Sequence, residues 1–172
     1  GKLAEKARYL TTQAKDDQVR YIHHAIGYNF RLTNMQAALG VAQLEQLPVF
    51  LERKREIFNQ YQTALENIGG LTLAGVPDYA NNNHWMNLLQ INSEAYGEDR
   101  EALMQRLGKN GIQSRPVWAL NYLQKPYSNC QTYNIKNSIE LVEKSLCIPS
   151  STNLTDIDIQ QLLGHLGSGP RK

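Results

Sequence analysis

A dense group of polar and aromatic residues occupies positions 27–31, where Gly27, Tyr28, Asn29, Phe30 and Arg31 follow one another. Side chains two residues apart on an extended segment point to the same side. A carboxamide and a guanidinium at that spacing both donate hydrogen bonds to phosphate oxygens, which indicates anion recognition. The alternative is a plain turn, in which Gly27 uses a free φ, Asn29 tolerates the left-handed region and Arg31 caps a carbonyl.

A second candidate for anion binding lies in the stretch 114–118, with the sequence Ser-Arg-Pro-Val-Trp. Pro116 restricts Arg115 to an extended backbone at the end of a predicted strand. The guanidinium offers a bidentate fork for a phosphate or carboxylate, and Trp118 offers a face for stacking. The alternative is a salt-bridged arginine beside a half-buried tryptophan.

The other reactive side chains form no known catalytic or metal-binding motif. The sequence has no glycine-rich phosphate loop, nucleophile elbow or metal-ligand spacing. His23 and His24 are adjacent, so their rings diverge, which favours a surface or interface role over a metal site. Cys147 stands in an apolar run and is expected to be a small buried hydrophobe. Trp85, beside His84, fits either the core or the wall of a pocket.

Composition argues against several classes of protein. The 172 residues are 41% hydrophobic and 20% charged, as expected for a globular chain with one ordinary core. The net charge is +2, and the basic residues 53–55 are flanked by glutamates, which argues against nucleic-acid binding. No apolar run reaches the ~20 residues of a membrane span. Two cysteines make no disulfide framework. We expect a cytoplasmic protein with no signal peptide and no membrane partner.

These candidate residues must be positioned by a long helix, which is the strongest local pattern. Apolar residues recur at helical spacing over positions 35–68. Thr33 or Asn34 can cap its first turn, and the glycine pair 69–70 is expected to end it. Pro48 lacks an N–H and clashes with the preceding turn, so it should kink or divide the helix.

The remaining elements are shorter. The expected helices cover 3–10, 99–109, 137–144 and 156–166, and the expected strands cover 71–73, 84–91, 112–117 and 146–149. The polar residues 13–18 should form a loop, and 119–133 should be irregular. Thr155 is expected to cap the last helix in a box with Asp158. Strands separated by helices predict a small α/β or α+β domain joined to the long helix.

Three stretches together resemble one family. "IGYNFRLTNMQAALGVAQLEQL", "GIQSRPVW" and "LCIPSSTNLTDIDI" are similar, in order and distance, to signatures of the DegT/DnrJ/StrS family. Its members are pyridoxal-phosphate (PLP) dependent aminotransferases that act on nucleotide-linked keto sugars. The resemblance covers residues 3–166. "QLEQLPVFLERKR" and the Arg-Pro-x-Trp pattern most resemble the branch that aminates UDP- or GDP-linked 4-keto-6-deoxy sugars for surface polysaccharides.

The resemblance implies an aspartate-aminotransferase fold in a homodimer whose active sites lie at the subunit interface. Residues 1–33 would end the large domain and carry an interface loop, 34–68 would be the kinked connecting helix, 69–167 the small domain and 168–172 a tail. The chain starts with Gly1 in a helical pattern, as a fragment would, and the lysine that carries the cofactor as a Schiff base is expected before it. No catalytic or metal residue is therefore assigned here, and the chain alone is expected to be inactive.

The resemblance also implies binding roles, residue by residue. Asn29 would bind the PLP phosphate of the other subunit, and Arg31 would line the same interface. The implied contacts of the sugar nucleotide are Arg115 and Trp118, with Tyr28 and His84 as further neighbours. The implied reaction is a ping-pong transamination from glutamate to the C4 ketone of the sugar, with PLP as the electron sink.

Two other functions remain open at this stage. Some relatives use pyridoxamine phosphate to dehydrate sugars, with a histidine in place of the lysine, and the residue that decides this lies outside the sequence. A sensor or interaction domain could use the same fold without catalysis. Base rates favour the aminotransferase.

Overall fold

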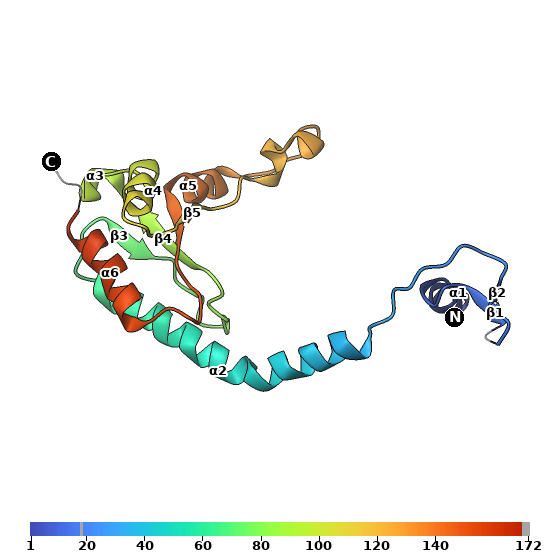
Figure 1. The fold of residues 1–172 in the computed structure, drawn as a ribbon. Helices are drawn as coiled ribbons and strands as arrows, with labels where there is room; N and C mark the ends of the chain where they lie inside the picture. Colours follow the sequence, from blue (N-terminus) through green and yellow to red (C-terminus); the bar gives the residue numbers. More distant parts are fainter. Residues whose placement is uncertain (18, 170–172) are drawn as a thin grey trace. The chain divides into compact units, whose positions relative to one another are not determined.

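The computed structural model describes residues 1–17 and 19–169 and shows two compact units (Figure 1). The N-terminal unit comprises residues 1–47, and the C-terminal unit begins at Pro48. Helix α2, Asn34–Leu65, contributes residues to both. The predicted division at 33, 68 and 167 stays a prediction, and most of the predicted tail lies outside the described residues.

The N-terminal unit contains one helix and a small hairpin. Helix α1 (Lys2–Thr11) confirms the predicted opening helix and is followed by strands β1 (Lys15–Asp17) and β2 (Ile22–His23), which pair antiparallel. The expectation of a loop over 13–18 is therefore wrong for 15–17, whereas residue 18 lies outside the described part. The hairpin has no apolar alternation. Instead, the Asp17 carboxylate accepts hydrogen bonds from the backbone N–H groups of Val19 and Arg20 at 2.8 and 2.9 Å. Hydrophobic periodicity does not reveal such a turn, because side-chain to backbone hydrogen bonds stabilise it.

Helix α2 begins as predicted. Thr33 Oγ1 accepts from the N–H of Gln36 at 3.2 Å, and Gln36 Oε1 accepts from the N–H of Thr33 at 2.9 Å, so the two residues form a capping box. Pro48 lies inside one continuous helix, so the alternative in which proline divides it is wrong. The helix ends at Leu65, and the chain turns at Gly70, whose φ of +81° favours glycine.

A four-stranded antiparallel sheet forms the centre of the C-terminal unit. Its strands are β3 (Leu71–Leu73), β4 (Asn87–Ile91), β5 (Arg115–Pro116) and β6 (Ser145–Ile148), in the order β3-β4-β6-β5. Asn87, Leu89 and Ile91 alternate inward along β4, as the period of two requires.

Helices cover both faces of this sheet (Figure 1). The inner face packs against the second half of α2 and against α4 (Arg100–Lys109) and α6 (Asp156–Gly167), which confirm two predicted helices. The core residues from these elements and the sheet are Ile57, Tyr61, Leu65, Leu71, Leu89, Ile91, Tyr96, Leu103, Leu107, Leu146, Ile148, Ile159, Leu162, Leu163 and Leu166. Helix α5 (Lys136–Lys144) lies over the outer face, where its residues share a cavity lining with Leu88 and Gln90. This mixed architecture confirms the predicted fold class.

Two strands are shorter than predicted, and three short helical segments were not predicted. Strand β4 starts at Asn87 rather than position 84, and β5 covers only Arg115 and Pro116. The additional segments are α3 (Ser93–Tyr96) and the 3₁₀ turns η1 (Asn121–Leu123) and η2 (Lys125–Tyr127). The residues before β4 leave the extended conformation because asparagine side chains bind their backbone, as described below. No helix of the described chain is long and apolar enough to cross a membrane.

Candidate functional site

The segment 28–30 runs beside the C-terminal end of α1. The N–H of Tyr28 donates to the carbonyl of Leu10 at 2.7 Å, and the N–H of Phe30 donates to the carbonyl of Thr11 at 3.1 Å. Asn29 forms an antiparallel bridge with Thr12. The segment is therefore held as an extended piece of backbone by hydrogen bonds on both sides of Asn29.

The side chains of this segment alternate as predicted. The rings of Tyr28 and Phe30 stack with centroids 5.1 Å apart and planes 16° from parallel, so they share one side of the segment. Asn29 then points to the other side. The side chains of Asn29 and Arg31 are exposed and make no hydrogen bond or ion pair with another described residue. Donors without a partner in the described chain, on an anchored backbone, are chemically suited to an anionic group.

The turn interpretation is wrong in its details. Gly27 does not have a positive φ, and neither does Asn29; the left-handed residues nearby are Gln13 and Ala14, at +68° and +48°. Arg31 caps no carbonyl of the described chain. Gly27 is required for a different reason, because a Cβ there would lie 2.3 Å from both Ala14 N and Gln13 C. The glycine lets two segments of backbone touch.

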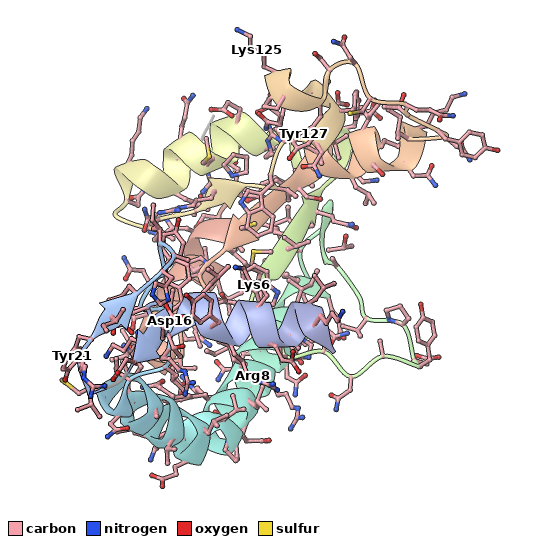
Figure 2. All side chains as sticks on the ribbon, turned by 90° about the vertical axis from the view of Figure 1, so that its right-hand side faces the viewer. Lys6, Arg8, Asp16, Tyr21, Lys125 and Tyr127 are labelled. Carbon is pink, nitrogen blue, oxygen red and sulfur yellow. The ribbon has the colours of Figure 1, made fainter. Side chains whose placement is uncertain are left out.

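The carboxylate of Asp16, which the sequence analysis did not identify, connects the hairpin to α1 by hydrogen bonds. Asp16, which is labelled in Figure 2, accepts through Oδ2 from Tyr9 Oη at 2.9 Å and from the N–H of His24 at 2.7 Å. The same oxygen lies 3.2 Å from His24 Nδ1. The hydrogen bond from the N–H of His24 lowers the pKa of Asp16 most, and the hydrogen bonds from the Tyr9 hydroxyl and the His24 ring lower it further. His23 Nδ1 lies 2.7 Å from the carbonyl of Gln13. Both histidines therefore make contacts within the N-terminal unit. No group of three metal-ligating side chains occurs among the described residues.

In the C-terminal unit, the structure brings Trp85 and Trp118 together. Their ring centroids are 5.7 Å apart, with planes tilted by 30°, and the residues are 56% and 67% exposed. The alternatives of a core position for Trp85 and a half-buried Trp118 are therefore wrong in this unit. The sequence left Trp85 without a role because its partner is 33 residues away in the chain.

His84 precedes Trp85 and is partly buried. Its ring packs on Phe58, with centroids 4.1 Å apart, and Nδ1 is buried without a hydrogen-bond partner in the described chain. Burial, and then the positive charge of Arg55, lower the pKa of His84, so the ring is neutral near pH 7. A neutral imidazole with a vacant nitrogen can accept or donate one hydrogen bond, but it adds no charge for an anion.

Arg115 lies on a strand, as the Arg-Pro pattern predicted, and this strand, β5, is at the edge of the sheet. Arg115 is paired with Cys147 of β6. Its side chain is exposed and forms no ion pair with another described residue. The alternative of a salt-bridged structural arginine is not supported within the described chain. Cys147 is only partly buried, and this burial raises the pKa of its thiol, as expected for a packing residue rather than a nucleophile.

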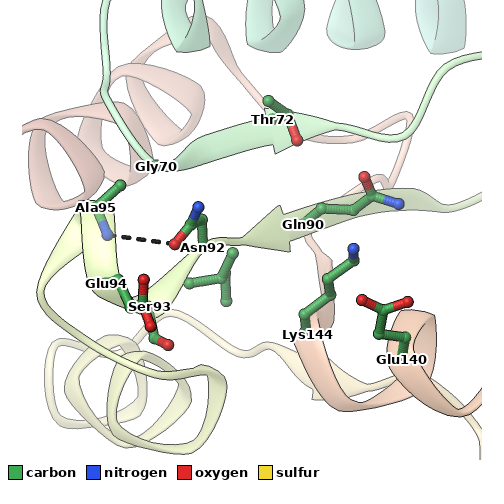
Figure 3. Close-up of a pocket in the computed structure, with 10 residues that line it drawn as sticks. Gly70, Thr72, Gln90, Asn92, Ser93, Glu94, Ala95, Glu140 and Lys144 are labelled. Atoms are coloured by element: carbon green, nitrogen blue, oxygen red, sulfur yellow. Dashed lines mark hydrogen bonds between the residues drawn. The ribbon is translucent and has the colours of Figure 1, made fainter.

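A polar hollow of the C-terminal unit lies elsewhere (Figure 3). It measures about 580 Å³ and is lined by residues of β3, β4, α3 and α5, including Gln90, Asn92 and Lys144. Asn92 Oδ1 there accepts from the N–H of Ala95 at 3.3 Å and thus caps α3. None of the residues predicted to bind substrate or cofactor lines this hollow, so it is not part of the candidate site.

The predicted residues thus form two groups. Tyr28, Asn29 and Arg31 belong to the N-terminal unit, and His84, Arg115 and Trp118 belong to the C-terminal unit. Both groups offer hydrogen-bond donors or flat aromatic faces to a ligand.

The fold is that of sugar aminotransferases. The aminotransferase TlmJ from Streptoalloteichus hindustanus matches with a TM-score of 0.79 at 24% identity, over 98% of this chain and 44% of that chain. DesI, solved with its TDP-sugar product, matches with a TM-score of 0.77 at 23% identity, over 96% and 42%. The chain belongs to the DegT/DnrJ/EryC1/StrS aminotransferase family, whose model matches residues 1–166. Membership indicates pyridoxal phosphate as the cofactor and confirms the resemblance found in the sequence.

Two curated relatives match most of the chain. It is 34% identical over 158 residues to the putative PLP-dependent aminotransferase EpsN of Bacillus subtilis, covering 88% of this chain and 39% of the relative. It is 30% identical over 165 residues to GDP-perosamine synthase of Caulobacter vibrioides, covering 95% and 44%. The chain therefore spans less than half the length of these relatives.

Proposed function

We propose that this chain is the C-terminal part of an aminotransferase that moves an amino group from glutamate to the C4 ketone of a nucleotide-linked sugar. The protein acts as a homodimer, in amino-sugar biosynthesis for surface polysaccharides. The observation that carries the proposal is the anchored segment 28–31, which presents exposed Asn29 and Arg31 donors in a chain of this family.

Each group of residues has a definite task in this proposal. Asn29 donates its carboxamide N–H to a phosphate oxygen of the cofactor in the other subunit, and Arg31 neutralises part of the phosphate charge. The bound cofactor supplies the electron sink for amino transfer. Arg115 pairs with the diphosphate of the sugar nucleotide, and His84 contacts the substrate. Tyr28 provides a further substrate contact. These contacts bind and orient the cofactor and the substrate, and the proton is moved by a residue outside this chain.

The full-length protein tests the proposal directly. It should be purified with PLP and incubated with glutamate and a panel of UDP- and GDP-linked 4-keto-6-deoxy sugars, and the products should be separated by mass. We expect one nucleotide sugar to gain an amino group at C4 while glutamate becomes 2-oxoglutarate. A product that has lost a hydroxyl without gaining nitrogen would identify a dehydratase instead. A protein that leaves every sugar and glutamate unchanged would contradict the proposal.

A further inference from the structure

Two exposed indole rings lie against each other in the C-terminal unit. Trp85 precedes β4 and Trp118 follows β5, and both keep more than half of their surface accessible. Large aromatic side chains in contact normally bury their faces in a core. Here the contact, with centroids 5.7 Å apart, leaves a flat apolar surface facing outward. Exposed aromatic surface of this kind marks a site of interaction.

The backbone around Trp85 is fixed, although its side chain is exposed. The N–H groups of His84 and Trp85 donate to the side-chain oxygens of Asn82 and Asn83 at 3.1 and 3.2 Å. The carbonyl of Trp85 accepts from Ser150 Oγ at 2.8 Å. His84 between them has a φ of +47°, a strained value for a residue with a Cβ. Strain of this kind persists where surrounding contacts enforce it, and it clusters at ligand sites.

Ser150 is itself anchored to the helix behind it. The ammonium of Lys54, on α2, donates to the carbonyl of Ser150. Trp85 is thus connected through Ser150 to a helix of the core, and its position does not depend on the packing of its own ring. An exposed ring held in this way is pre-organised for a ligand, because binding does not have to order it.

The distance between the rings decides how a planar ligand would bind. A flat ring held between two parallel rings needs a contact of about 3.5 Å on each side, or about 7 Å in all. The rings of Trp85 and Trp118 are closer than this and tilted by 30°, so nothing planar fits between them. A planar ligand must therefore stack on the solvent-exposed face of one indole. The other indole then lies against the opposite face of that ring or next to the ligand.

We propose that Trp85 and Trp118 form a stacking platform for the base of the sugar nucleotide. The platform adds a ligand subsite and a substrate residue, Trp85, to the site described above, and it rests on the proposed function for the identity of the ligand. Stacking on tryptophan does not discriminate strongly between bases, because every base has a π face. The platform therefore supplies affinity, and the choice between uridine and guanosine nucleotides is made by other residues.

Nucleotide affinity in the full-length protein tests the platform. Binding of UDP, GDP and inorganic pyrophosphate is measured by calorimetry for wild type, Trp85→Ala, Trp85→Phe, Trp118→Ala and Tyr79→Ala. Loss of one stacked ring should weaken binding of the better nucleotide by roughly five- to 150-fold. Trp85→Phe, which keeps a ring, should recover most of that loss. Pyrophosphate, which has no base, should bind all the variants equally.

Tyr79→Ala is the matched control, because Tyr79 is an aromatic residue of the same unit that is 93% exposed and has no aromatic partner in the described chain. It should leave every affinity unchanged. Thermal melting of each variant checks that the unit remains folded, and the exposure of Trp85 and Trp118 predicts little change.

Several outcomes would overturn the platform. One is unchanged nucleotide affinity in both alanine variants, as expected if another part of the protein covers the indoles. Equal losses for pyrophosphate would show a disturbed site rather than lost stacking. Free fucose, a 6-deoxy sugar, is titrated in the same way, and a loss confined to fucose would show that the sugar, not the base, lies on the rings. A wild-type protein that binds neither nucleotide would also contradict it.

The platform and the proposed function can fail separately. Nucleotide binding is measured without any amino transfer, so tryptophan-dependent binding by a protein that aminates no sugar would contradict the function alone. Amination of a keto sugar with no effect of the tryptophan variants on nucleotide affinity would contradict the platform alone.

Discussion

Gly27 and Ala14 are in backbone contact, and a Cβ on Gly27 would lie 2.3 Å from the nitrogen of Ala14. Real Cβ atoms do not approach a backbone nitrogen so closely, so any other residue at 27 must move one of the two segments. The segment that carries Asn29 follows directly, which makes this contact the support of the candidate phosphate site. The importance of Gly27 therefore follows from steric contact rather than from a special φ.

Gly27→Ala should weaken retention of PLP by the full-length dimer, because the added methyl group displaces segment 28–31 from the end of α1. The measurement is the dissociation constant of PLP for the apo protein, followed by absorbance, together with hydrogen exchange of the Tyr28 and Phe30 amides. Gly40→Ala is the control, since a Cβ there meets nothing within 4 Å. In α2 this control should be neutral or up to about 1 kcal/mol stabilising. PLP affinity equal to wild type in Gly27→Ala would contradict the steric account.

Asn29→Ala should weaken PLP binding by roughly ten- to 100-fold, the effect of losing one hydrogen bond to a charged group of about 1.5–3 kcal/mol. The backbone of Asn29 is held by its neighbours, so the fold should be unchanged. The matched control is Asn59→Ala, an exposed asparagine on α2. The same PLP titration reads out both variants. If Asn29→Ala and Asn59→Ala retain the cofactor equally, segment 28–31 serves the fold only.

Glu98→Ala should destabilise the C-terminal unit by about 3 kcal/mol, because it leaves the Arg106 guanidinium without its carboxylate in a largely buried place. Arg106 Nε and Nη2 donate to Glu98 Oε1 and Oε2 at 3.0 and 2.7 Å, and Nη1 donates to the carbonyl of His165 at 2.8 Å. Urea unfolding measures the change. Glu94→Ala, an exposed neighbour, should change the free energy of unfolding by less than about 0.5 kcal/mol. Similar midpoints for the two variants would refute a structural role for the pair.

Asp16→Asn should lower stability at neutral pH and have no effect in strong acid. The folded protein holds the pKa of Asp16 below its usual value, so the carboxylate contributes stability above the unfolded pKa of about 3.9. That contribution is lost as the pH falls through the lowered folded pKa. Melting temperatures of wild type and variant, measured between pH 7 and pH 3, should therefore converge as the pH falls. Asp78→Asn, an exposed loop aspartate, is the control. A difference between wild type and Asp16→Asn that stays constant with pH would show that the carboxylate charge is not involved.

The local features of the fold could be predicted where the sequence patterns were strong. The sustained period of α2 and the capping box of Thr155 with Asp158 appear as predicted, and the structure selects Thr33 from the two predicted caps of α2. Strand β4 was predicted too long, because asparagine side chains bind the backbone N–H groups of His84 and Trp85. Hydrophobic periodicity measures burial, and it carries no information about such side-chain to backbone bonds.

Some features of the candidate site could likewise be predicted from the sequence, and others could not. The types and alternation of Asn29 and Arg31 were visible in the sequence, because they depend only on residues two apart. The pairing of Trp85 with Trp118 and the triple contact of Asp16 were not, because their partners lie many residues away or on another element.

The sequence alone determined the family, the fold class and the donor groups, since signatures, periodicity and residue chemistry are local properties of the chain. Only the tertiary structure decided that Gly27 serves backbone contact, that Trp85 is exposed beside Trp118, and that Asp16 joins the hairpin to α1. These features arise from packing between segments that are distant in sequence. No local pattern encodes such packing, because the free energy of each contact depends on where the rest of the chain places its partner.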